Sequence, residues 1–184
     1  VVIENQQLQA ENILNQYEAL KNQLNPHMLF NSLNTLRSLV REDQDKAQEY
    51  IQELSRVLRY TLQGNDSKSV CVKDEIEFVS AYIFLLKMRY EDNLEFDIRI
   101  DEAAGGRQLP PMSVQLLIEN AVKHNEISNR HPLVIRVFTE GNRLTVSNPV
   151  QRKLTASGGL QIGLANLAKR YNLLFKEEIE VREE

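Results

Sequence analysis

The chain has 184 residues, is 42% hydrophobic and 26% charged, and carries a net charge of −4, which is an ordinary globular composition. It has no clustered basic run, so we expect no nucleic-acid partner and no direct binding to an anionic membrane. The one cysteine, Cys71, excludes an internal disulfide and suits a reducing compartment. No apolar run approaches the ~18 residues of a membrane span.

The first forty residues favour a helix with a coiled-coil-like seam. Residues 1–41 contain one proline and no glycine. Apolar side chains recur at spacings of 4, 3 and 4, and a second stripe follows: Ile13, Tyr17, Leu20 and Leu24, then Leu29, Leu33, Leu36 and Val40. A second helix is expected at about 44–62, and its predicted buried face is Ala47, Ile51, Leu54, Leu58 and Thr61. The polar turn at 41–45 predicts an antiparallel hairpin, and a homodimeric four-helix bundle would bury both stripes.

A turn-rich linker at 63–73 separates this hairpin from a region of mixed helices and strands. We therefore expect an α+β protein with two domains. The expected elements are helices at 74–90, 110–125 and 162–175, strands at 94–100, 133–139 and 143–147, and the start of a strand at 178–181.

Residues 23–34, QLNPHMLFNSLN, place a proline and a histidine inside the helical pattern. His27 and Asn31 fall on one polar stripe, so we expect His27 to be accessible, and a neutral imidazole is a nucleophile near pH 7. Pro26 would bend the helix beside it. The alternative is a histidine without function, with Asn25 and Pro26 as the N-cap and first residue of the helix.

A second cluster lies at the end of the helix expected at 110–125. Asn120, Lys123 and His124 stand at i, i+3 and i+4. The carbonyl oxygen of an asparagine suits Mg²⁺, which bridges nucleotide phosphates, and the two basic residues suit phosphate oxygens. The alternative is a solvated helix end with an ordinary charge pair.

A third cluster is glycine-rich. Gly158, Gly159 and Gly163 precede or open the expected last helix, so the backbone N–H groups and the helix dipole can hold an anion there. The spacing is neither that of a P-loop nor that of a dinucleotide fingerprint, and glycines also simply end loops.

Together the three clusters resemble the cytoplasmic core of LytS/YesM-type sensor histidine kinases, over essentially the whole chain. QLNPHMLFNSLN resembles the phosphoacceptor motif of that family, IENAVKH its N box and GLQIGLANL its second glycine box. The resemblance implies a coiled coil and phosphoacceptor hairpin over 1–62, the linker at 63–73, and over 74–184 a GHKL-type α/β-sandwich ATP-binding domain truncated at its C-terminus.

The resemblance also implies roles for single residues. His27 would be phosphorylated, Asn120 would bind Mg²⁺, and Lys123 and His124 would lie near the phosphates of ATP. The adenine and glycine-loop positions would be Asn148, Gly159 and Gly163. The implied activity is ATP-dependent autophosphorylation in a homodimer and transfer to the receiver-domain aspartate of a response regulator. This portion would be cytoplasmic, in a bacterial protein held at the inner membrane by an upstream sensor region.

The sequence departs from the family pattern at both glycine boxes. Val146-Ser147-Asn148-Pro149 replaces V-x-D-N-G, and Gln161 replaces the middle glycine of the second box. The alternative function is therefore a catalytically weak dimeric scaffold with a degenerate ATP site. A GHKL protein-serine kinase is a further alternative, which would not need the histidine hairpin.

Two roles stay open at this point. Glu119 either polarises the incoming histidine or pairs with a cation. Asn31 either positions a water for dephosphorylation or packs between helices. Leu116 occupies the position of the water-activating glutamate of hydrolytic relatives, so we expect poor hydrolysis of free ATP. The linker and the Pro26 bend are the expected moving parts.

Overall fold

The computed structural model describes residues 26–63, 68–153 and 160–183. The chain divides into two compact units, Val1–Gln63 and Gly64–Glu184, and we describe each by itself. We call them the N-terminal unit and the C-terminal unit. No helix in the described ranges is long and apolar enough to cross a membrane.

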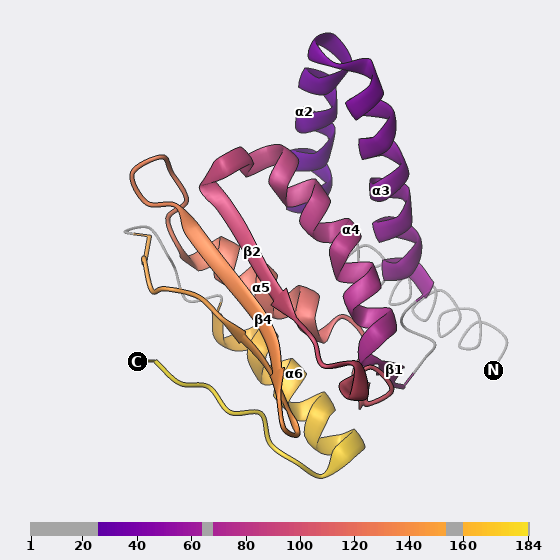
Figure 1. Ribbon diagram of the computed structural model, residues 1–184, viewed down its shortest axis with the longest axis vertical. Helices are drawn as coiled ribbons and strands as arrows, with labels where there is room; N and C mark the ends of the chain where they lie inside the picture. The colour runs from indigo at the N-terminus through magenta and orange to yellow at the C-terminus, as the bar shows by residue number, and fades with distance from the viewer. Residues whose placement is uncertain (1–25, 64–67, 154–159, 184) are drawn as a thin grey trace, which may run out of the picture. The chain divides into compact units, whose positions relative to one another are not determined.

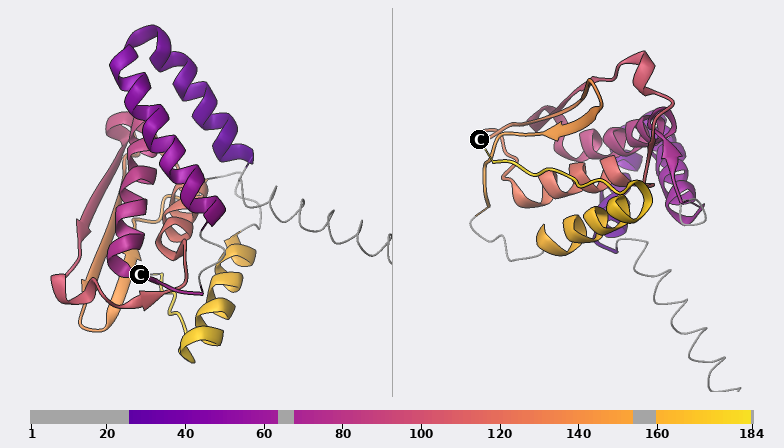
Figure 2. Two further views of the ribbon diagram at one scale, coloured as in Figure 1. Left: turned by 90° about the vertical axis from the view of Figure 1, so that its right-hand side faces the viewer. Right: turned by 90° about the horizontal axis from the view of Figure 1, so that it is seen from below.

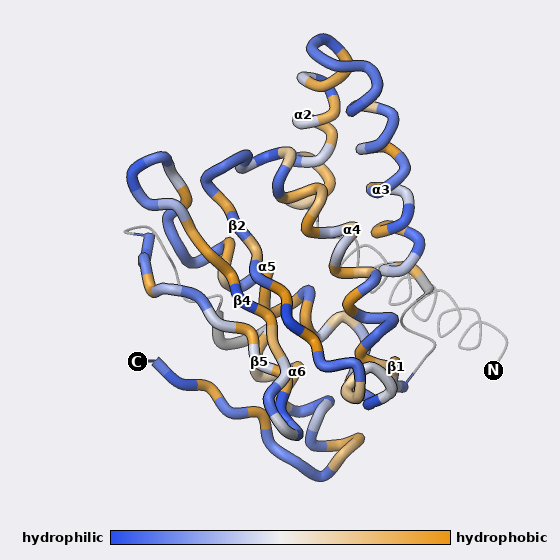
Figure 3. Tube along the Cα trace, in the orientation of Figure 1, coloured by the Kyte–Doolittle hydropathy of each residue, from blue (hydrophilic) through white to orange (hydrophobic). Residues whose placement is uncertain are grey.

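The described part of the N-terminal unit is a helical hairpin (Figure 1). It consists of α2 (Pro26–Glu42) and α3 (Gln44–Gln63). Asp43 alone separates the two helices, and its carboxylate accepts a hydrogen bond of 3.0 Å from the backbone N–H of Lys46, which caps the start of α3. Figure 3 shows the turn as a hydrophilic tip. The two helices were expected, but the turn is tighter than the predicted 41–45.

The buried face of α3 differs from the predicted one. Tyr50 is 1% exposed and Val57 is fully buried, whereas Ile51 is 46% exposed. The predicted face was therefore wrong at two positions, because Tyr50 and Val57 are buried in place of Ile51 and Leu58. Both stripes share Ala47, Leu54 and Thr61. A 3-4-3-4 spacing and a 4-3-4-3 spacing fit the same apolar sequence, and only packing chooses between them.

The C-terminal unit combines helices with a three-stranded mixed sheet of order β2-β4-β5 and a two-stranded sheet of order β1-β3. Its helices are α4 (Val72–Tyr90), α5 (Ser113–His124) and α6 (Leu160–Phe175), with short 3₁₀ turns at Glu91–Asn93 and Glu102–Ala104. Its strands are β1 (Val70–Cys71), β2 (Leu94–Arg99), β3 (Gln108–Leu109), β4 (Leu133–Glu140) and β5 (Arg143–Ser147). The expected α+β class is confirmed.

The sheet is apolar on one face. β2 runs parallel to β4 and pairs Leu94 with Leu133, while β5 runs antiparallel to β4. Leu94, Leu133, Ile135 and Val137 are all completely buried, and because side chains alternate along a strand they point to one face. Figure 2 shows the helices of this unit gathered on one side of the sheet. The opposite face carries the polar residues of the same strands.

The start of α5 is held by a buried carboxylate from α4. Glu75 is completely buried, and its two oxygens accept hydrogen bonds of 3.0 Å each from the backbone N–H groups of Met112 and Val114. Met112 has a left-handed backbone (φ 64°) and no side-chain cap. Glu75 therefore acts in place of an N-cap residue. The helix begins at Ser113, whereas the sequence predicted a start at the two prolines before it.

The strand predicted at 178–181 does not form. Residues 177–183 have no regular structure, and Val181 is 63% exposed. Side-chain ion pairs hold this tail: Arg143 bonds to Glu180 at 2.7 Å, and Arg152 pairs with Glu183. An alternating apolar pattern forms a strand only where it can pair with a sheet edge and bury its apolar side chains. The exposure of Val181 shows that this tail does not bury them, so the predicted strand was wrong.

Replacing Glu75 by Gln should destabilise the chain by about 2–4 kcal/mol, because an amide cannot accept a hydrogen bond at both ends and one buried N–H of α5 loses its partner. Urea unfolding measures this difference. Glu77→Gln, on the exposed side of the same helix, is the matched control and should change stability little. Equal effects of the two variants would contradict the capping role.

Candidate functional site

The C-terminal half of α5 carries buried polar atoms without partners. The Nδ2 atom of Asn120 and the Nε2 atom of His124 are buried and make no hydrogen bond, and the same is true of Gln115 Oε1 earlier on the helix. Buried polar atoms in proteins are nearly always hydrogen-bonded. Asn120 and His124 lie one turn apart on one face, so a polar ligand bound there would satisfy both.

The electrostatic surroundings keep His124 neutral. Burial lowers the pKa of its imidazole first, and the positive charges of Lys123 and Lys153 lower it further. A neutral ring offers one donor and one acceptor nitrogen. His124 is thus suited to donate a hydrogen bond to a ligand without adding a full charge.

The segment after β5 is tied to the end of α5. Asn125 anchors it: its Oδ1 accepts from the backbone N–H of Gln151 at 2.7 Å, and its Nδ2 donates to the carbonyl of Ala121 at 2.8 Å. The backbone N–H of Lys153 donates to the carbonyl of His124 at 3.1 Å. Residues 151–153 and α5, which are far apart in sequence, are therefore joined by hydrogen bonds.

Lys153 also caps the C-terminal end of α5. Its ammonium donates to the carbonyls of Val122 at 3.2 Å and Lys123 at 3.0 Å, which no longer have intrahelical partners. Sequence reasoning missed both Lys153 and Asn125, because no local pattern shows that residues 151–153 return to this helix.

Asn148 lies just before residues 151–153 and is half-buried. Its Nδ2 donates to the carbonyl of Pro149 at 2.7 Å. The Oδ1 atom is the group that suits an exocyclic amine such as that of adenine.

The start of α6 lies beside the middle of α5. A Cβ atom built on Gly163 would stand 3.5 Å from Cδ1 of Leu116, an ordinary contact. Gly163 is in the first turn of α6, whose N–H groups lack intrahelical partners and suit an anion. Gly158 and Gly159 lie outside the described residues.

Glu119 lies near Tyr82 of α4. Its carboxylate raises the pKa of the Tyr82 phenol, which burial raises most. Glu119 is half-buried on α5 next to Asn120 in sequence, yet it shares a neighbourhood with Tyr82. Its catalytic role stays a prediction.

In the N-terminal unit, His27 is exposed at the start of α2, as the polar stripe predicted. The Nδ2 atom of Asn31 lies 3.2 Å from Nε2 and 3.3 Å from Nδ1 of the His27 ring. Asn31, one helical turn after His27, is thus placed to position the ring. Pro26 is exposed and opens the described helix. The predicted bend depends on Asn22, which lies outside the described residues.

The described residues contain no group of three or more histidine, cysteine, aspartate or glutamate side chains that could hold a metal ion. A magnesium ion at this site would thus depend on the amide of Asn120 and on the oxygens of a bound phosphate chain, which is how Mg²⁺ is often held. The metal ligand would be the carbonyl oxygen Oδ1 of Asn120, because the buried Nδ2 atom, which has no partner, is a hydrogen-bond donor and suits a phosphate oxygen instead.

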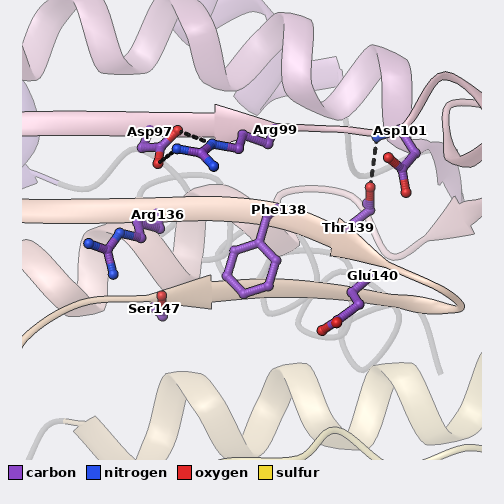
Figure 4. A pocket seen from close by; sticks show the side chains of 8 residues that line it. All are labelled: Asp97, Arg99, Asp101, Arg136, Phe138, Thr139, Glu140 and Ser147. Atoms are coloured by element: carbon purple, nitrogen blue, oxygen red, sulfur yellow. Dashed lines mark hydrogen bonds and ion pairs between the residues drawn. The ribbon is translucent and has the colours of Figure 1, made fainter.

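The polar face of the sheet has a hollow of about 720 Å³ lined by eight residues, Asp97, Arg99, Asp101, Arg136, Phe138, Thr139, Glu140 and Ser147 (Figure 4). Its charges are partly neutralised within the hollow, because Arg99 bonds to Asp97 at 2.8 Å through both Nε and Nη2. None of the residues predicted from sequence lines it.

Comparison with known proteins bears on these clusters. A family model described as histidine kinase matches residues 15–94, a range that contains His27 and α4. The chain is 30% identical over 181 residues to the sensor protein LytS of Enterococcus faecalis, covering 88% of this chain and 30% of that protein. It is 33% identical over 176 residues to LytS of Streptococcus agalactiae serotype V, covering 86% and 30%.

The sensor histidine kinase BtsS of Escherichia coli K12 is 33% identical over 150 residues, which cover 78% of this chain and 27% of that protein. The chain thus spans about 30% of the length of the relatives it matches. By sequence it is related to the histidine kinases, and among them it is similar to the LytS-type sensor kinases, as the three motifs indicated.

The lowered pKa of His124 predicts a pH-dependent stability. In the unfolded chain a histidine titrates near 6.5. As the pH falls below that value, the unfolded chain binds the proton first and the free energy of unfolding decreases. Between about pH 7.5 and 5.5, urea unfolding should therefore show a smaller loss of stability for His124→Gln than for the unmodified chain. An identical loss in both would contradict the lowered pKa.

Proposed function

We propose that this chain is the phosphoacceptor and ATP-binding part of a sensor histidine kinase of a two-component system. The observation that carries the proposal is the pair of buried, partnerless donors on α5, Asn120 Nδ2 and His124 Nε2, which lie in the N-box motif of a chain related to LytS. A nucleotide phosphate bound beside them would supply the missing acceptors.

The acceptor of the phosphoryl group is His27. It is exposed at the start of α2 and has the amide of Asn31 against its ring. In the proposed reaction the Nε2 lone pair forms a bond to the γ-phosphorus of ATP, and ADP leaves as the bridging P–O bond breaks. Mg²⁺ held with Asn120 would reduce the negative charge on the phosphates. The phosphohistidine would then serve an aspartate of a response regulator.

The proposal includes a homodimer. Large apolar side chains are exposed on the described hairpin: Phe30 at 68%, Leu33 at 49%, Val40 at 51% and Ile51 at 46%. Such side chains on both helices suit a second hairpin, which would complete a four-helix bundle. The functional division would be a phosphoacceptor hairpin over 1–62, a linker at 63–73 and a GHKL-type domain over 74–184, with any membrane attachment upstream and the chain on the cytoplasmic side.

Incubation with γ-labelled ATP and Mg²⁺ tests the phosphoacceptor. The chain should acquire a label that is labile to acid and stable to alkali, as expected for a phosphohistidine, and His27→Gln should abolish it. His131→Gln, an exposed histidine of the C-terminal unit, should keep it. A label that survives acid would indicate a serine kinase instead, and the absence of both label and nucleotide binding would indicate the scaffold function.

Gly163→Ala tests the glycine loop separately. The new methyl group would make only ordinary contact with Leu116, and alanine favours a helix over glycine by up to about 1 kcal/mol, so stability should be kept or rise. If a phosphate approaches this turn closely, ATP affinity should fall nonetheless. Titration calorimetry measures the affinity and urea unfolding the stability. Unchanged affinity would remove Gly163 from the binding site.

A further inference from the structure

Basic side chains from three separate segments converge on the C-terminal end of α5. Lys123 and His124 belong to the helix itself. Lys153 arrives from the segment after β5 and bonds to the carbonyls of Val122 and Lys123. Arg89, near the end of α4, is close enough to lower the pKa of Lys153, for which burial is the larger cause.

We call these four residues, Arg89, Lys123, His124 and Lys153, the α5 basic cluster. No ion pair formed between described residues involves Arg89, Lys123 or Lys153. Burial raises the pKa of the Tyr82 phenol most, Glu119 raises it further and Arg89 lowers it. Burial also lowers the pKa values of His124 and Lys153 most, and their positively charged neighbours lower them further.

Helix stability alone does not account for this arrangement. Cations in the last turn complement the helix dipole, which explains Lys123 and the capping by Lys153. It explains neither Arg89, which is on another helix, nor the buried Nε2 of His124, which has no partner. The guanidinium of Arg89 lies 4.9 Å from the ring centroid of Tyr90. Stacking of this kind uses the face of the group and leaves its in-plane N–H donors for an anion.

We infer that Arg89 and Lys153 are phosphate-binding residues that act with Lys123 and His124 on the polyphosphate chain of the nucleotide. The inference rests on the proposed function, and it adds two ligands that the N-box and glycine-box motifs do not contain. A multiply charged anion is the class of ligand indicated, because the cationic groups come from three elements and several charges must be balanced at once.

Lys153 also lies in a segment that is held against α5. It belongs to the segment that Asn125 ties to α5 through the 2.7 Å bond to Gln151, and it is followed by the glycine-rich residues 154–159 in sequence. A phosphate bound by its ammonium would therefore connect the ligand to the segment that leads into the second glycine box.

Charge-removing variants of the full 184-residue chain test the inference. Lys153→Gln keeps a side-chain N–H donor for the helix carbonyls but loses the charge, and Arg89→Gln loses a charge that caps nothing. Arg99→Gln, on the opposite face of the sheet, removes one positive charge far from the cluster and is the matched control. Titration calorimetry compares ATP with Mg²⁺, adenosine and inorganic tripolyphosphate, and urea unfolding reports stability.

Lys153→Gln and Arg89→Gln should each weaken ATP and tripolyphosphate binding roughly tenfold, the loss expected for one charge-assisted hydrogen bond, and leave adenosine binding unchanged. Arg99→Gln should match the unmodified chain. Equal weakening of ATP and adenosine, or no weakening, would overturn the inference while the proposed function stands. Tripolyphosphate binding that depends on Arg89 and Lys153, in a chain that does not bind ATP, would overturn the proposed function and keep the anion site.

Discussion

The hydrogen bonds from the start of α5 to the buried carboxylate of Glu75 fix the position of the helix that carries the candidate site. A carboxylate with no exposure can be retained only if its oxygens are satisfied, and the backbone N–H groups of Met112 and Val114 do this. The same bonds replace the cap that the Pro110-Pro111-Met112 sequence cannot provide. Arg170 of α6 adds a bond of 2.6 Å to the carbonyl of Pro111, so three helices meet at this point.

The other end of α5 is held by a charge of opposite sign. Lys153 donates to two terminal carbonyls, so a carboxylate lies at the positive end of the helix dipole and an ammonium at the negative end. Asn125 also holds residue 151 of the segment after β5 against this end of the helix, because its Oδ1 accepts from the backbone N–H of Gln151. With both ends fixed by other elements, Asn120 and His124 are kept in place although their buried atoms have no partner, and this is the rigidity that a binding site requires.

The sheet supplies the surface against which this helix is placed. The central strand β4 buries Leu133, Ile135 and Val137 completely, while the alternate positions, which include Arg136 and Glu140, stay at least partly exposed. Burial on one face specifies the register, because a shift by one residue would bring Arg136 into the core. The candidate site and the proposed phosphate ligands all lie in the C-terminal unit, whereas His27 lies in the hairpin.

The sequence by itself determined most of the helices and strands. Periodicity predicted the hairpin helices, the α+β class and the β4–β5 hairpin, and residue types predicted sites at His27 with Asn31 and at the Asn120, Lys123 and His124 group. These are properties of neighbours within about one turn of a helix or one strand pair. The tertiary structure alone decided which apolar stripe of α3 is buried, that 178–181 is no strand, and that Glu75, Asn125 and Lys153 make hydrogen bonds at the ends of α5. Their roles come from contacts between residues tens of positions apart, and the chain at each of these positions contains no local pattern that encodes its partner.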